Sequence, residues 1–202
     1  MKRNNAMMKD FTRLLLPDLG RERTDRVMEF AWNRLEQLLT AHAGESRALR
    51  THTEGSLYPA ISVYEALQAD GMAREEALEL LDRLCSRRAE KQARMIRMSL
   101  KLPGLYRKMP AIFRWMTVHN FGEAAGFQAH FYETDKTRCK FDMTHCVYHT
   151  VCTENGCPEL TKCFCHTDDV TNGNMHPKIR WHRTKTIGEG ADICDFEIIV
   201  EK

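Results

Sequence analysis

Through the first 122 residues, hydrophobic side chains recur every three or four positions, which is the period of an α-helix with one buried face. Glycine and proline residues interrupt the pattern at Pro17 and Gly20, near Gly44, at Gly71 and at Pro103. Helices are expected to end at such residues. The third hydrophobic segment also contains a proline, Pro59, so a kink is expected there. The pattern predicts helices over residues 7–16, 24–44, 54–69, 73–100 and 109–120.

At Gly126 the period of the pattern changes from 3.6 to 2, as in a β-strand with one buried face. Hydrophobic residues alternate with polar ones over residues 127–131 and 139–143, and turn residues lie between the two runs at 134–136. The alternation returns over residues 179–187 and 194–200, on either side of a Gly-Glu-Gly turn. Two β-hairpins are therefore expected, with a helix over residues 158–171 between them, opened by Pro158.

This order of elements predicts an α+β fold, in which a helical N-terminal half packs on an antiparallel sheet of two hairpins with an inserted helix. A chain of 202 residues is long enough to bury a core and is expected to form a single domain over residues 1–202. Residues 1–122 would be its helical half. Residues 123–202 would be its α+β half.

The chain has 30 Lys and Arg against 28 Asp and Glu, a net charge of +2, so no overall field attracts nucleic acid or an anionic membrane. The basic residues of 73–100 are interpreted as a solvated helix face, although a nucleic-acid or phospholipid surface is the alternative. Because the chain has no apolar run of roughly 20 residues and no signal-peptide core, the cytoplasm is the expected location. A homo-oligomer is left open.

Six of the eight cysteines fall between Cys139 and Asp168. In a reducing cytoplasm, cysteines are expected to be metal ligands, nucleophiles or small core residues. We expect Cys85, Cys139 and Cys194, each on an apolar face, to serve packing. Functional roles are open for three others, Cys146, Cys152 and Cys165. Their spacing does not match that of a structural zinc ribbon, although a zinc or iron site is compatible with it.

Two further features point to chemistry near these thiols. His145 and His166 adjoin Cys146 and Cys165, and a neighbouring imidazole can lower the pKa of a thiol and make it a nucleophile. Arg183 lies at an inward-facing position of its predicted strand. A buried arginine needs a carboxylate, which could come from Asp168, from Glu159 or from a bound ligand.

The cysteine-rich segment resembles the L-2-amino-thiazoline-4-carboxylic acid hydrolase family. The resemblance covers roughly residues 53 to 199 and begins in the helical half, at Tyr58-Pro59-x-Ile61-x-x-Tyr64-x-x-Leu67 and Glu75-Glu76-Ala77-Leu78. Its C-terminal part consists of Cys146-x-Tyr148, Cys152, Gly156-x-Pro158-Glu159-Leu160, Cys165-x-x-Asp168, Arg183-Thr184, Thr186, Gly188 and Cys194-Asp195-Phe196. The chain departs from the family pattern at His145, where Arg or Lys is frequent, and at Cys157 and Cys163. The order of elements also resembles the TRAPP-like ligand-binding fold.

The resemblance implies a hydrolase that opens the ring of a small cyclic amidine bearing a carboxylate. The reaction needs a nucleophile, a carboxylate to move protons and a cation for the substrate. The catalytic residues implied are Cys146, Cys165, Glu159 and Asp168, and the substrate-binding residues are Arg183, His145 and Tyr148. If zinc or another divalent metal is present, Cys146, Cys165 and Asp168 would hold it. The alternatives are a small-molecule sensor with a structural zinc and no turnover, and a helical interaction protein.

Overall fold

The computed structural model describes residues 4–201. Its first helix, α1 (Ala6–Ala41), contains two helical segments that meet at Gly20, whose φ of 71° leaves the helical region. Glycine adopts such a positive φ without steric cost. The break predicted between residues 16 and 24 is therefore confirmed, and it lies at Gly20 because Pro17 is accommodated within the first segment.

A π-helical turn (Thr53–Leu57) separates α2 (Arg47–His52) from α3 (Tyr58–Ala69). Pro59 lies at the start of α3, where a missing backbone N–H costs little. The irregularity expected near Pro59 is thus a widened turn immediately before it. Single π-helical turns are rare and often occur at functional sites.

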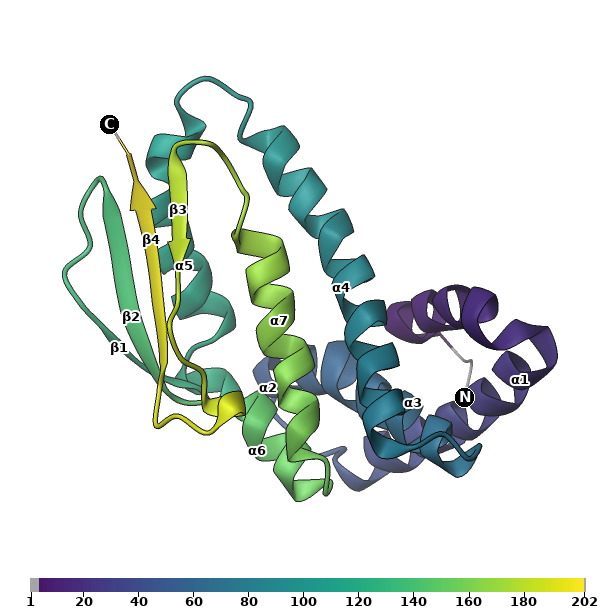
Figure 1. Ribbon diagram of the computed structural model, residues 1–202. Coiled ribbons are helices and arrows are strands. Elements are labelled where there is room, and N and C mark those ends of the chain that lie inside the picture. Colours follow the sequence, from purple (N-terminus) through teal and green to yellow (C-terminus); the bar gives the residue numbers. More distant parts are fainter. Residues whose placement is uncertain (1–3, 202) are drawn as a thin grey trace.

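The two helices that follow agree closely with the sequence pattern. They are α4 (Arg74–Ser99) and α5 (Met109–Asn120), joined by a short 3₁₀ turn (Leu105–Lys108). Figure 1 shows α1 and α3 on the far side of α4 from the sheet. Contacts join α1 to α3 and α4 to α7 (Thr161–Asn172), while α5 packs on the sheet and α2 contacts the 3₁₀ turn Glu123–Ala125 that leads into it. Among the helices of the N-terminal half, α5 therefore makes the main contacts with the sheet.

Four antiparallel strands make up the sheet in the order β1-β2-β4-β3. They are β1 (Gln128–Phe131), β2 (Arg138–His145), β3 (Ile179–His182) and β4 (Cys194–Val200). Both predicted hairpins are confirmed, and the two hairpins join through β2 and β4. The α+β fold class is confirmed as well.

The third strand is shorter than predicted, because it ends at His182 rather than near residue 187. Beyond it, the Asp195 carboxylate accepts hydrogen bonds from the backbone N–H groups of Thr184 and Lys185, at 2.9 and 2.8 Å. These bonds satisfy the backbone donors that a longer strand would have paired within the sheet. A 3₁₀ turn (Ile187–Glu189) follows.

Two helices connect β2 to β3. The first, α6 (Val147–Glu154), was not predicted from the sequence. A 3₁₀ turn (Pro158–Leu160) then leads into α7 (Thr161–Asn172), which confirms the helix expected over 158–171. Among the described residues, no helix is both long and apolar enough to pass through a lipid bilayer.

Candidate active site

The ends of three strands bring the cysteine-rich segment together. Met143 of β2 pairs with Cys194 at the start of β4, so these two strand ends lie at the same end of the sheet. At that end Cys146 is the N-cap residue of α6, and Arg183 follows the last residue of β3. Helix α7 packs beside α6 and contributes Cys165 and Asp168, which lie three residues apart and thus on one helix face.

Electrostatic interactions show which of these side chains are neighbours. The Asp168 carboxylate acts on the thiols of Cys146, Cys165 and Cys194 and on the phenol of Tyr148. Arg183 acts on Cys165, Cys194 and Asp168. We call these residues the thiol–carboxyl cluster: Cys146, Tyr148, Cys165, Asp168, Arg183 and Cys194. Cys194, expected to serve packing, is thus also a neighbour of the candidate residues.

The Arg183 side chain is only 4 % exposed and points inward, as its position in the alternation predicts. Its guanidinium donates to the Cys165 carbonyl oxygen at 2.9 Å and to an Asp169 carboxylate oxygen at 2.5 Å. A weaker contact of 3.5 Å reaches Asp168. Arg183 therefore has two carboxylates of the chain itself as partners, and both come from α7. The Glu159 partner considered from the sequence is not among them.

Burial raises the pKa of Asp168 to about 7, against the lowering effect of the Arg183 charge. The neighbouring Asp169 charge raises it further. Nevertheless, 45 % of the Asp168 side chain remains accessible to solvent. The carboxyl group can therefore exchange protons with solvent. Near neutral pH it can both accept and donate a proton, as a general acid–base catalyst must.

Burial also raises the pKa values of the Cys146, Cys165 and Cys194 thiols, each to about 11. The prediction that adjoining histidines lower these pKa values is wrong, because both imidazoles point elsewhere. His166 Nδ1 lies 2.9 Å from the Asp82 carboxylate on α4, and exposed His145 lies beside Thr150. The thiols of the cluster are therefore protonated at neutral pH in the free protein.

Tyr148 is held by His52, a residue that was not selected from the sequence pattern. His52 Nε2 lies 2.6 Å from the Asn120 carbonyl oxygen, which can only accept, so Nε2 carries the proton. The other ring nitrogen, Nδ1, then accepts from the Tyr148 hydroxyl at 3.2 Å. Ser56, from the π-helical turn, is also a neighbour of the Tyr148 phenol. The widened turn thus places His52 and Ser56 around one phenol, and burial lowers the pKa of His52.

Glu159 lies at another position and has other partners. It accepts from the Tyr64 hydroxyl at 2.6 Å and from Arg74 Nε and Nη2 at 2.7 and 2.8 Å. Although burial alone would raise its pKa, these hydrogen bonds hold the pKa of Glu159 below its usual value. The carboxylate ties the start of α7 to α3 and α4. This position suits a structural ion pair better than proton transfer.

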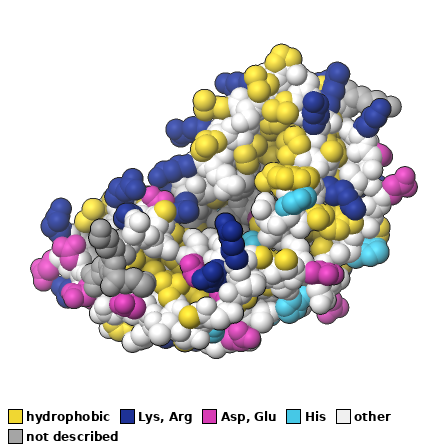
Figure 2. Space-filling view, turned by 180° about the vertical axis from the view of Figure 1, so that it is seen from behind, with side chains coloured by type: hydrophobic (Ala, Val, Ile, Leu, Met, Phe, Trp, Pro, Cys, Tyr) yellow, Lys and Arg dark blue, Asp and Glu magenta, His cyan; other side chains and the backbone are white. Residues whose placement is uncertain are grey.

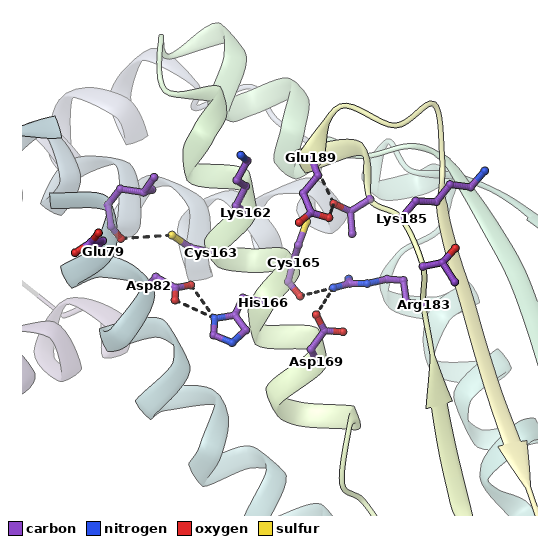
Figure 3. Close-up of a pocket in the computed structure, with 13 residues that line it drawn as sticks. Glu79, Asp82, Lys162, Cys163, Cys165, His166, Asp169, Arg183, Lys185 and Glu189 are labelled. Atoms are coloured by element: carbon purple, nitrogen blue, oxygen red, sulfur yellow. Dashed lines mark hydrogen bonds and ion pairs between the residues drawn. The ribbon is translucent and has the colours of Figure 1, made fainter. Parts of the chain in front are cut away.

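A pocket of about 460 Å³ opens between α4, α7 and the segment that follows β3 (Figure 3). Cys165 and Arg183 belong both to its lining and to the thiol–carboxyl cluster. Lys162, His166 and Asp169 also line it. The backbone at Gly188 passes so close to Cys165 that an added Cβ would lie 3.0 Å from the sulfur. The lack of a side chain at Gly188 thus allows the segment to cover Cys165.

The residues expected from the sequence as metal ligands, Cys146, Cys165 and Asp168, do not form a metal-binding group. Within residues 4–201, no three His, Cys, Asp or Glu side chains form a group that could hold a metal ion. The set Cys146, Cys165 and Asp168 therefore does not fit a metal as arranged here, and we derive no step through one. Cys152 is fully buried beside Cys157, and both thiols are free.

Solved structures similar to the chain include two H-NOX proteins. One is from S. oneidensis in the Fe(II)NO ligation state, with 12 % identity, a TM-score of 0.34 and coverage of 98 % of this chain and 100 % of that chain. The other is Fe(II) unliganded H-NOX from K. algicida, with 13 % identity, a TM-score of 0.35 and coverage of 97 % and 95 %. At such low similarity, no property of these proteins is carried over.

No curated protein sequence matches the chain. The model of the L-2-amino-thiazoline-4-carboxylic acid hydrolase family matches residues 50–198. This match spans most of the chain, including α3 to α7, the first three strands and most of β4. It agrees with the resemblance seen in the sequence motifs, and the chain therefore belongs to the L-2-amino-thiazoline-4-carboxylic acid hydrolase family.

Proposed function

We propose that the protein hydrolyses a small cyclic amidine that carries a carboxylate, opening the ring of a substrate like L-2-amino-thiazoline-4-carboxylate. One observation carries the proposal beyond the family name. Asp168, with a pKa of about 7, lies beside the Cys165 thiol of its own helix and the Cys146 and Cys194 thiols of two other segments, all within the part of the chain that matches the family. Ring opening needs this combination of a proton-transferring carboxylate and a nucleophile.

Cys165 is the proposed nucleophile, because it lines the open pocket. The neighbouring Thr186 side chain also opposes the rise in the pKa of its thiol that burial causes. With a thiol pKa of about 11, a free thiolate is present in only about one molecule in 10⁴ at pH 7. Attack therefore requires a base, and Asp168 takes the thiol proton as the sulfur bonds to the ring carbon between sulfur and nitrogen. Cys146, which also lies near Asp168, is the second candidate.

The remaining steps balance with the same groups. The bond between the ring carbon and the ring sulfur breaks, and the Asp168 carboxylic acid returns its proton to the departing sulfur. Water then adds to the carbon held on Cys165, again with Asp168 as base. The carbon–Cys165 bond breaks and Cys165 regains a proton, so one water is consumed. A carbamoyl group remains on the substrate nitrogen, and the former ring sulfur becomes a free thiol of the same product molecule.

Arg183 is proposed as the positioning residue for Asp168. Its guanidinium is buried, holds Cys165 by the carbonyl oxygen and keeps the pKa of Asp168 from rising further. Direct binding of a substrate carboxylate, as the sequence suggested, would require Asp169 to leave the guanidinium. Lys162, whose side chain borders the pocket, is the cation we propose for the substrate carboxylate.

Thiol release provides the test. Purified protein is mixed with L-2-amino-thiazoline-4-carboxylate, and the new thiol is followed with a chromogenic disulfide reagent. Steady release is expected from the native chain and from Cys139→Ala, a control in which a cysteine buried in β2 is removed. Release is expected to fall below detection in Cys165→Ala. A native chain that releases no thiol, or a Cys165→Ala variant as active as the control, would refute the proposal.

A further inference from the structure

Several large hydrophobic side chains are exposed on the last turns of α4, on the loop after it and on α5. Figure 2 shows hydrophobic side chains gathered over this region, with Lys and Arg at its margins. Met95 and Met98 lie opposite the buried Ala93 and Leu100 on the helix. The most exposed are Met95, Met98, Leu102, Trp115 and Val118, at 70, 63, 62, 59 and 46 %.

The same surface is strongly basic. Residues 87–119 contain nine Lys and Arg and one acidic residue, Glu90, so this segment carries a net charge of +8 within a chain of net charge +2. Arg87 and Arg88 pair with acidic residues of α1. Within residues 4–201, no ion pair is found for the cations nearest the exposed hydrophobic side chains, which are Lys91, Arg94, Arg97, Lys101 and Lys108.

We propose that this surface binds an anionic phospholipid bilayer. Met, Leu and Trp side chains enter the boundary between headgroups and acyl chains, where Trp is favoured, while Lys and Arg contact anionic headgroups. The phosphates of a nucleic acid would pair with the Lys and Arg side chains, but the exposed methionines and Leu102 would have no apolar partner. A second copy packed face to face would bring two charges of +8 together. An anionic bilayer matches both the charge and the apolar centre.

This inference differs from the expectation that the chain has no membrane partner. That expectation relied on the small net charge of the whole chain, and it saw no exposed aromatic residue among the basic ones. The fold separates the charges, so one surface is basic although the total is near zero. Trp115 of α5 is exposed, as are Met95 and Met98 of α4. Hydrophobic side chains gather on the face of the molecule that Figure 2 shows.

Co-sedimentation with vesicles tests the proposal, using phosphatidylcholine vesicles with and without phosphatidylglycerol. The native chain is expected to sediment with the anionic vesicles and to stay in solution with the neutral ones. Each cation near such a surface contributes about 1 kcal/mol, or about fivefold in affinity. Arg94→Gln with Lys101→Gln is therefore expected to weaken binding about 25-fold, as two such factors. Met98→Ser with Trp115→Ser is expected to weaken it about tenfold or more.

A matched control changes the same residue classes elsewhere. Phe30 of α1 is 45 % exposed, and Arg21 on the same helix is also exposed. Phe30→Ser with Arg21→Gln is expected to bind vesicles like the native chain. All of these residues lie outside the thiol–carboxyl cluster, so thiol release by each variant reports separately on the proposed hydrolase.

Four results would overturn the proposal. They are the absence of sedimentation with anionic vesicles, equal binding by the Met98→Ser, Trp115→Ser variant, equal loss in the α1 control, and binding to a DNA duplex as tight as to vesicles. Equal binding by the apolar variant would show that charge alone acts. DNA binding of equal strength would identify a nucleic-acid surface. A native chain that sediments only with anionic vesicles, and only while both classes of side chain are present, supports the proposal.

Discussion

The guanidinium of Arg183 lies 3.5 Å from the Asp168 carboxylate, and yet the pKa of Asp168 is about 7. Two features explain why the cation does not keep this carboxyl group ionised. Burial disfavours the charged form, and the shorter contact of Arg183, at 2.5 Å, goes to Asp169. Asp169 thus both competes for the arginine and repels a charge on Asp168. Burial, Arg183 and Asp169 together place the pKa of Asp168 near neutral pH.

We expect kcat/KM for ring opening to rise with pH, with a midpoint near 7, because ionised Asp168 is the form that accepts a proton. Asp168→Asn is expected to lower kcat by about 10² to 10⁴ and to remove this midpoint. Asp142→Asn is the control, since Asp142 is bound by Tyr132 on the sheet. A rate that is independent of pH between 5 and 9 in the native chain would contradict the assignment.

Substitutions at the two neighbours of Asp168 should move the pH midpoint in opposite directions. Arg183→Ala removes the charge that lowers the pKa of Asp168, so the midpoint should rise. Asp169→Asn removes the like charge and leaves Arg183 to Asp168, so the midpoint should fall. Complete pH profiles of kcat/KM measure both shifts. If Arg183→Ala instead raises KM about tenfold or more at an unchanged midpoint, as expected for loss of a charge-assisted bond, the arginine binds the substrate directly.

Alkylation by iodoacetamide should inactivate the enzyme slowly at pH 7. Because only the thiolate reacts and the pKa of Cys165 is about 11, the inactivation rate should increase about tenfold per pH unit up to pH 10. Peptide mass mapping at partial inactivation identifies the modified residue. A rate that levels off below pH 9 would show that a thiol of ordinary pKa carries the activity.

His52 should make stability sensitive to mild acid. Burial lowers its pKa in the folded state, so between that value and 6.5 the unfolded chain binds a proton that the folded chain does not. Stability should therefore fall as the pH decreases below about 6.5. His52→Phe should cost about 1–3 kcal/mol at pH 8, because the buried Asn120 carbonyl and Tyr148 hydroxyl lose a partner. Its stability should change less with pH in urea titrations. An unchanged pH slope in the variant would contradict this account.

Dialysis against EDTA should leave the rate of ring opening unchanged, since the residues proposed as ligands do not form a group that could hold a metal here. The rate is measured before dialysis, after it and after addition of zinc. A loss of activity that zinc restores would show that the ligands rearrange around a metal and would revive the zinc alternative.

Most of the fold could be predicted from the sequence because its elements are strongly periodic. Hydrophobic residues recur with the 3.6-residue period of a helix along α4, and with the two-residue period of a strand along β2 and β4. The short α6 was missed because eight residues give little periodicity, and residues 147–154 were interpreted only for their cysteines. The π-helical turn before Pro59 contacts α6, which is distant in the sequence, and no local pattern contains such a contact.

The residues of the thiol–carboxyl cluster could largely be selected from the sequence, but their pKa values could not be predicted from it. Cys146, Cys165, Asp168, Tyr148 and Arg183 were selected from motifs, and the structure brings them together. The pKa values could not be predicted, because they depend on burial and on the directions of side chains. His145 and His166 adjoin the cysteines in sequence, but helix and strand geometry turns the imidazoles away from the thiols. Whether each residue acts in catalysis stays a prediction.

The segment between β3 and β4 supplies Arg183 at one end and covers Cys165 with Gly188 near the other. It is held by the Asp195 side chain rather than by the strand ladder, so its length is not fixed by the register of the sheet. Insertions or deletions there would reshape the wall of the pocket while α7 and its acid–base group stay in place. Within such a family, one mode of bond cleavage can thus be retained while the molecules admitted to it diversify.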